Sequence, residues 1–235
     1  MARRATYFFD VHKTDSPRIL VSGGWEYSDP VGVNTPTSEV LEQLAKAYTL
    51  LDYDVAFMGK KESELLSKND ITPDKGRLTS QDELVKVHPT PDGHKVAFIR
   101  FPSLSKGEDI PSRELIQKIS DIVKREQANA DLLIGMSDWG WVGEREYIGQ
   151  APQFMPDILL GSGFGSGVTG RFDANRRCAW YRPYDKGRTV VEVQVNTWPD
   201  RSKPEAWTNP KSIKSLSIGL GDKFIDNTKV DALFQ

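Results

Sequence analysis

Residues 130–140 read ADLLIGMSDWG, a run of apolar side chains that ends abruptly in a polar loop. The same arrangement recurs in residues 18–25 (RILVSGGW), 52–62 (DYDVAFMGKKE) and 156–165 (PDILLGSGFG). Short apolar runs of this kind are typical of strands that are buried on both faces of a parallel sheet. Because parallel strands end at the same edge, we expect the four loops to meet where open α/β sheets carry their chemistry.

Helical patterns alternate with these strands, in residues 3–12, 35–51, 111–123 and 144–150. The segment 35–51 begins with Thr-Pro, which is a hydroxyl cap followed by proline at the first helical position. Its apolar residues then recur at helical spacing and define one buried face. Alternation of strands and helices predicts a mixed α/β architecture.

The remaining segments have β and loop character. The turn signal PDG at 91–93 lies between apolar runs at 84–87 and 96–99 and predicts a hairpin. Residues 69–82 are polar and predict a surface loop. Further strands are expected in residues 178–183, 189–197 and 212–218. No internal repeat is present, so the simplest organisation is a single domain spanning residues 1–235.

Composition excludes several classes of function. The net charge is −2 and the 31 basic residues are dispersed, so the chain lacks the basic footprint of a nucleic-acid-binding protein. No apolar stretch approaches the roughly 20 residues that span a bilayer, which argues against membrane insertion. No signal-peptide hydrophobic region is visible. The single cysteine, Cys178, cannot form an internal disulfide and is interpreted as a small core residue.

A resemblance to a known family rests on the order of several short matches rather than on any one of them. The matching stretches are, in chain order, residues 3–6, 18–24, 50–59, 130–137, 156–161 and 184–190. They resemble calcineurin-like metallophosphoesterases, and within these the N-terminal domain of bacterial 5′-nucleotidases. Residues 50–59, 130–137 and 156–161 are similar to the lead-ins of that branch's Gly-Asn-His-Glu, Ser-His and Gly-Gly-His-x-His loops.

The resemblance implies a fold and a chemistry. The fold is a four-layer α/β sandwich of two mixed β-sheets flanked by helices, and the chemistry uses two divalent metal ions about 3.5–4 Å apart. It also implies that the family's first Asp-x-His strand falls before residue 1, and that the C-terminal nucleotide-binding domain of 5′-nucleotidases is absent. Family membership suggests a periplasmic or extracellular location, which the residues themselves leave open.

The residues at the implied metal-ligand positions have the wrong chemistry. The family's ligands fall, in chain order, on Trp25, Lys60, Lys61, Asp138, Gly163 and Gly165, and Glu62 completes this vestigial site. An indole does not bind a hard cation, an ammonium group repels it, and glycine offers no side chain. Only Asp138 is a plausible ligand. We therefore expect no catalytic residue, no metal ligand and no cofactor, although the family would carry a divalent metal pair.

Two other groups of residues contain potential metal ligands. Asp10-Val11-His12 matches the Asp-x-His pattern of the family's first strand. However, the next strand begins about six residues later, which leaves no room for the helix that normally lies between these two strands. His88 and His94 flank the hairpin turn and are interpreted as exposed residues rather than as a metal site.

The substitutions suggest what fills the former site. Lys60 or Lys61 could pair with Asp138, because a carboxylate in a desolvated cleft needs a partner, or both lysines could be solvated. The aromatic residues Trp139 and Trp141, together with Trp25, could bind a ligand or could plug the cleft.

Glycine- and proline-rich segments allow two further readings. Residues 161–170 could be taken for a phosphate-binding loop, but they lack the P-loop ending and read better as a flexible remnant of the metal loop. Residues 199–210, with Trp198 and Trp207 nearby, suggest an ordered surface loop that could meet another domain.

The sequence thus favours a degenerate, catalytically inactive 5′-nucleotidase-like domain that acts as a binding or scaffold module for a protein partner or an adjacent domain. The alternative is an active metal-dependent phosphoester hydrolase with a relocated site drawn from Asp54, Glu62, Asp138 and Asp157. A third hypothesis is redox chemistry at Cys178, which requires a low thiol pKa and partial exposure.

Overall fold

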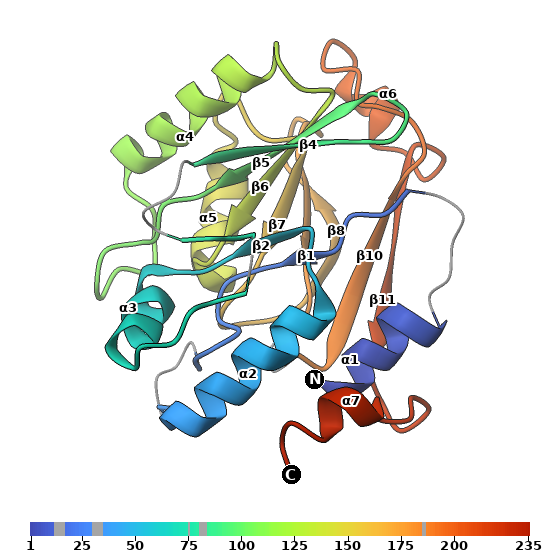
Figure 1. Cartoon of the computed structure of the whole chain (residues 1–235). Helices are drawn as coiled ribbons and strands as arrows, with labels where there is room; N and C mark the ends of the chain where they lie inside the picture. The colour runs from blue at the N-terminus through green and yellow to red at the C-terminus, as the bar shows by residue number, and fades with distance from the viewer. Residues whose placement is uncertain (12–16, 30–34, 75, 80–83, 185–186) are drawn as a thin grey trace.

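The computed structural model describes residues 1–11, 17–29, 35–74, 76–79, 84–184 and 187–235 (Figure 1). Helices pack on both outer sides of stacked β-sheets in this part of the chain. The mixed α/β class expected from the sequence is therefore confirmed.

The largest sheet has the strand order β4-β5-β6-β7-β9-β8. Its strands are β4 (Val85–Pro89), β5 (Lys95–Arg100), β6 (Leu132–Ser137), β7 (Ile158–Gly161), β8 (Val168–Phe172) and β9 (Ala179–Arg182). The four central strands are parallel, and β4 and β8 pair antiparallel at the two edges. The β4–β5 pairing confirms the predicted hairpin.

Side-chain alternation along the central strands separates two cores. In β5, Ala97 and Ile99 face the helices α4 (Arg113–Glu126) and α5 (Gly140–Gln150). Val96 and Phe98 face the opposite way, into a core between the sheet layers. Strands with both faces covered are fully apolar, which is why these segments show no polar alternation in the sequence.

The second sheet layer differs in detail from the expected single mixed sheet. Among the described residues it consists of a parallel sheet, β1 (Val21–Ser22), β2 (Val55–Phe57) and β3 (Arg77–Leu78), and an antiparallel ribbon, β10 (Thr189–Val195) and β11 (Ile213–Gly219). Val55 and Phe57 pack toward the large sheet, while Ala56 and Met58 pack toward the outer helices. The two sheet layers and the helices on their two outer sides form a four-layer sandwich.

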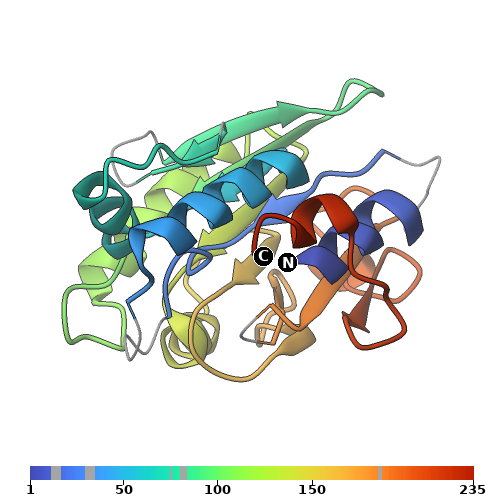
Figure 2. The same ribbon diagram turned by 60° about the horizontal axis from the view of Figure 1, so that its bottom comes forward.

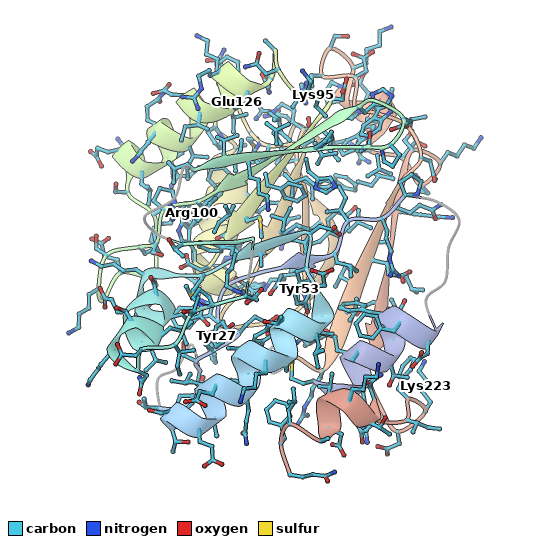
Figure 3. All side chains as sticks on the ribbon, in the orientation of Figure 1. Tyr27, Tyr53, Lys95, Arg100, Glu126 and Lys223 are labelled. Atoms are coloured by element: carbon cyan, nitrogen blue, oxygen red, sulfur yellow. The ribbon has the colours of Figure 1, made fainter. Side chains whose placement is uncertain are left out.

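The outer helices of this second layer are α1 (Ala2–Thr6), a π-helical turn (Tyr7–Val11), α2 (Ser38–Leu51) and α7 (Thr228–Asp231). Both views show the two ends of the chain side by side, where α1 meets α7 (Figures 1 and 2). Tyr27 and Tyr53 are buried beside α2 (Figure 3). The short helix α6 (Pro204–Trp207) lies in the predicted loop 199–210, and Trp207 is buried.

Helix starts follow local side-chain chemistry. Ser112 caps α4, because its hydroxyl accepts a hydrogen bond from the Leu115 N–H. Helix α2 begins slightly later than expected, since Thr37 rather than Thr35 provides the capping hydroxyl.

Two sequence expectations need correction. Residues 69–82 are expected to form a loop but include β3, and the loop expected over residues 161–170 runs into β8. Asp10 lies in the π-helical turn, which agrees with the helix expected over residues 3–12 and not with the alternative strand, and His12 lies outside the described residues. No helix in the described part of the chain combines the length and apolar character that crossing a bilayer requires.

Candidate functional site

The four loops identified in the sequence converge at the carboxyl ends of β1, β2, β6 and β7. The Trp25 indole N–H donates a hydrogen bond to the Asp138 carbonyl at 2.9 Å. The Gly24 N–H donates to Ser162 Oγ at 3.1 Å. A Cβ added to Gly59 would lie 2.7 Å from Asp138 Oδ2. Loops that are far apart in sequence thus form one tightly packed cluster.

Asp138 lies at the centre of this cluster and its side chain is only 8 % exposed. Its Oδ2 accepts a hydrogen bond from Ser103 Oγ at 2.7 Å, whereas Oδ1 has no hydrogen-bond partner in the described part of the chain. Burial raises the pKa of this carboxyl, and the Ser103 hydrogen bond and the charges of Arg100 and Lys61 act in the opposite direction. Sequence reasoning did not select Ser103.

Trp25 lies between the Asp138 loop and the Gly163 loop. Its backbone has φ 69°, a left-handed conformation that is costly for a residue with a bulky side chain. A Cβ on Gly163 would come within 2.9 Å of the indole nitrogen, so glycine there leaves room for the ring. The indole therefore fills the space in which side chains of the two loops would otherwise meet.

Glu62 holds the Trp25 loop against the start of α3 (Lys60–Lys68). Its carboxylate accepts hydrogen bonds from the backbone N–H groups of Trp25 at 2.7 Å, Tyr27 at 2.6 Å and Gly59 at 3.4 Å. The side chain is buried, and burial raises the pKa of the carboxyl to about 7. Glu62 is thus an internal anchor in this structure.

Glu62 should make stability depend on pH. Its pKa rises from an ordinary 4.5 to about 7 on folding, so it stabilises the fold fully below about pH 4.5 and loses this contribution as the pH rises through 7. We expect the free energy of unfolding, measured in urea, to fall between pH 5 and pH 8, with Glu62 contributing on the order of 3 kcal/mol. The fall should be smaller in Glu62→Gln.

A matched control for this experiment is Glu64→Gln, which changes an exposed carboxyl on the same helix. It should retain the wild-type slope. An equal slope in Glu62→Gln and wild type would show that the Glu62 pKa is not raised on folding.

Of the two alternatives for Lys60 and Lys61, the structure agrees with solvated lysines and not with a direct ion pair to Asp138. Lys61 is exposed and its ammonium group lies 5.4 Å from the centre of the Trp25 ring. Lys60 is exposed and lies 3.8 Å from Glu64. The Trp25 ring gives Lys61 a favourable contact at the surface, where its charge remains solvated. Lys61 therefore influences Asp138 only through its charge.

The two tryptophans near the start of α5, Trp139 and Trp141, lie in different environments. Trp139 is buried, donates to the Pro102 carbonyl at 2.7 Å and packs on Phe101, so it belongs to the core. Trp141 is half-buried, and the Arg145 guanidinium lies 4.4 Å from its ring centre. A Cβ on Gly165 would overlap Trp141, so this glycine makes room for the second indole.

A buried ion pair supports the loop after β7 and was missed in the sequence. Glu144 of α5 accepts hydrogen bonds from Trp180 Nε1 at 2.9 Å, Arg182 Nη1 at 3.3 Å and the Ser162 N–H at 3.1 Å. Burial raises its pKa to about 8, although Arg182 acts to lower it. The sequence carries no local signal of this pair, because Glu144 and Arg182 lie 38 residues apart.

The proposed relocated site is not assembled. Asp54 and Asp157 precede β2 and β7, at the opposite ends of these strands from Glu62 and Asp138. Asp54 accepts a hydrogen bond from the Leu20 N–H, and Asp157 pairs with Arg201 at 2.8 Å. These two carboxylates therefore cannot share a metal with the loop cluster.

The remaining candidates also have structural roles. Cys178 is fully buried and burial raises its pKa well above the ordinary range, so the redox hypothesis is wrong and its interpretation as a core residue is confirmed. His88 and His94 are half-buried and not exposed as expected: His94 lies 3.3 Å from Asp131 and packs against the Trp198 ring, and His88 lies on β4. Within the described ranges, no group of three or more His, Cys, Asp or Glu side chains is placed to hold a metal ion.

Two solved structures with a similar fold are described as 5′-nucleotidases. A protein from Staphylococcus aureus provisionally assigned as a 5′-nucleotidase, in complex with alpha-ketoglutarate, matches with a TM-score of 0.60 and 14 % identity, over 98 % of this chain and 51 % of that chain. A 5′-nucleotidase from Candida albicans matches with a TM-score of 0.56 and 16 % identity, over 92 % of this chain and 47 % of that one.

The chain thus spans about half the length of these two structures. No family model matches the sequence, and no curated protein matches it either. At these identities the likeness concerns the fold. The mixed α/β fold of this chain is similar to that of about half of each of these structures, in line with the fold that the sequence resemblance implied.

Proposed function

We propose that this domain does not hydrolyse phosphoesters and instead serves as a binding or scaffold module. The observation that carries the proposal is the position of Trp25. On the resemblance, this residue stands where the family has its metal-bridging aspartate, and its indole N–H donates to the Asp138 backbone. A bulky hydrogen-bond donor therefore occupies a position that would need a negatively charged acceptor.

The neighbouring groups fit a dinuclear metal site no better. Such a site needs several carboxylate or imidazole ligands that converge on two adjacent points. The buried carboxylate of Asp138 is approached closely by Gly24 and Gly59. Lys60 and Lys61 are exposed cations, and the Glu62 carboxylate is engaged by backbone N–H groups. The donor set does not match the family's chemistry.

The same contacts support the proposal that the loops form a packed binding surface and not a catalytic centre. Indole, glycine and backbone groups pack where a reactive centre would require open coordination positions. Interlocked loops on a rigid α/β scaffold provide a surface of defined shape, which is a common basis for binding.

Metal retention tests the proposal directly. Purified protein is incubated with Mn²⁺ or Zn²⁺, passed through a desalting column and examined by metal analysis, and hydrolysis of p-nitrophenyl phosphate is measured with and without EDTA. We expect no stoichiometric metal and no EDTA-sensitive hydrolysis in either wild type or Asp138→Asn. Retention of one or two metal equivalents, with activity that is lost in Asp138→Asn, would instead establish the hydrolase alternative.

A further inference from the structure

Two cation–aromatic pairs flank the glycine-rich loop after β7. Lys61 lies over Trp25 at 5.4 Å, and Arg145 lies over Trp141 at 4.4 Å. Trp25 contacts this loop at Gly163, and the Trp141 N–H donates to the Phe164 carbonyl at 2.8 Å. The two pairs are therefore connected through the residues around Phe164.

The surface between the pairs exposes large apolar side chains. Phe164 is 63 % exposed and Tyr184 is 55 % exposed, which is high for aromatic residues. Together with Trp141 they line a shallow hollow of about 500 Å³. We call the surface formed by Lys61, Trp25, Phe164, Trp141, Arg145 and Tyr184 the aromatic face. Interfaces are enriched in aromatic residues and arginine, so this composition is typical of a protein-binding surface.

The charges of this face indicate the character of its partner. Neither Lys61 nor Arg145 forms an ion pair with a carboxylate in the described part of the chain, so both cations remain available. A two-fold contact between copies would use the same patch twice and would bring positive charge against positive charge. Charge complementarity therefore favours an acidic partner over a second copy of this chain.

We propose that the aromatic face binds a partner protein through a segment in which carboxylates lie beside an aromatic or large aliphatic side chain. The apolar side chain would cover Phe164 and enter the hollow beside Trp141, and the carboxylates would pair with Arg145 and Lys61. This inference rests on the proposed binding function, and it identifies the surface and the partner chemistry.

Peptide selection provides the test. Random 12-residue peptides displayed on phage are selected on the wild-type protein, with counter-selection on a variant that combines Phe164→Ser and Arg145→Glu. Enriched peptides are synthesised with a fluorophore, and their affinity is measured by fluorescence anisotropy. We expect enriched sequences to carry Asp or Glu next to an aromatic or large aliphatic residue.

Single variants locate the contact. Phe164→Ser should weaken binding roughly tenfold or more, as expected for a central anchor. Lys61→Glu and Arg145→Glu should weaken it less and reduce its dependence on salt, because they change rim charges. Ile225→Ser is the matched control: Ile225 is 83 % exposed but lies outside the aromatic face, so this variant should bind like wild type.

Four results would overturn the inference: no enriched peptide, enriched peptides without acidic residues, unchanged binding by Phe164→Ser, or a dimer that Phe164→Ser dissociates in sedimentation velocity. The last result would identify a second copy as the occupant. Metal-dependent hydrolysis by the wild-type protein would overturn the proposed function instead. A protein that retains no metal, hydrolyses nothing and selects no acidic peptide would refute only the present inference.

Discussion

Gly161→Ala should lower the free energy of unfolding by about 3–5 kcal/mol. Gly161 ends the central strand β7, directly against the Glu144 carboxylate. An added Cβ would overlap Glu144 Oε2 and Cδ and would lie 2.7 Å from Oε1. Glu144 is fully buried and cannot move away without breaking its contacts with Arg182 and Trp180. Overpacking and the loss of a buried ion pair therefore act together.

Urea unfolding followed by circular dichroism measures this effect, and Gly219→Ala is the control. Gly219 ends strand β11, and a Cβ there would meet no atom within 4 Å. Because alanine restricts the unfolded chain more than glycine does, Gly219→Ala should be neutral or stabilising by about 0.5–1 kcal/mol. If Gly161→Ala and Gly219→Ala had similar free energies of unfolding, Glu144 would have room to shift, and its contact with Gly161 would not restrict the side chain at position 161.

At pH 9, above the Glu144 pKa of about 8, Arg182→Met should lower the free energy of unfolding by about 3–5 kcal/mol, because it leaves the Glu144 carboxylate buried without its cation. The pair is almost inaccessible to solvent, with 1 % of the Arg182 side chain and none of the Glu144 side chain exposed. Arg182 also donates hydrogen bonds to the carbonyls of Gly163 at 2.8 Å and Phe164 at 3.2 Å. The variant should therefore also loosen the loop that carries Phe164.

The effect of Arg182→Met should grow with pH. Arg182 lowers the pKa of Glu144, so its removal raises that pKa further above its already elevated value of about 8. A raised carboxyl pKa stabilises the fold at low pH and loses this contribution as the pH rises through it. The difference between wild type and Arg182→Met is therefore expected to be larger at pH 9 than at pH 5, as measured by urea unfolding at both values.

Two further variants define what the Arg182 result means. Adding Glu144→Gln should recover part of the stability, because a neutral side chain is less costly to bury than an unpaired charge. Arg3→Met removes a half-buried surface arginine that pairs with the exposed Asp222, and it should change stability by less than about 1 kcal/mol. Equal effects of Arg182→Met and Arg3→Met would contradict a special role for the buried pair.

The sequence determined much of the fold because burial leaves a local pattern. Strands such as β6 and β7 are covered on both faces and are therefore continuously apolar, so they could be located without a structure. Ser112 caps α4 through a contact only three residues away. The parallel order of the strands brings the loops after β1 and β2 to one sheet edge and the loops after β6 and β7 to another. The two pairs of loops meet because the two sheets pack against each other.

Only the tertiary structure decided how the loops pack. Trp139 and Trp141 are the same type of residue and lie two positions apart in the sequence. Trp139 enters the core and Trp141 remains at the surface, because the backbone turns between them at the start of α5. Lys61 lies on Trp25 rather than against Asp138, and Glu144 meets Arg182 across 38 residues. Local patterns record whether a segment is buried, but they do not record which distant side chain it meets. Pairing of charges and aromatic rings depends on that three-dimensional proximity.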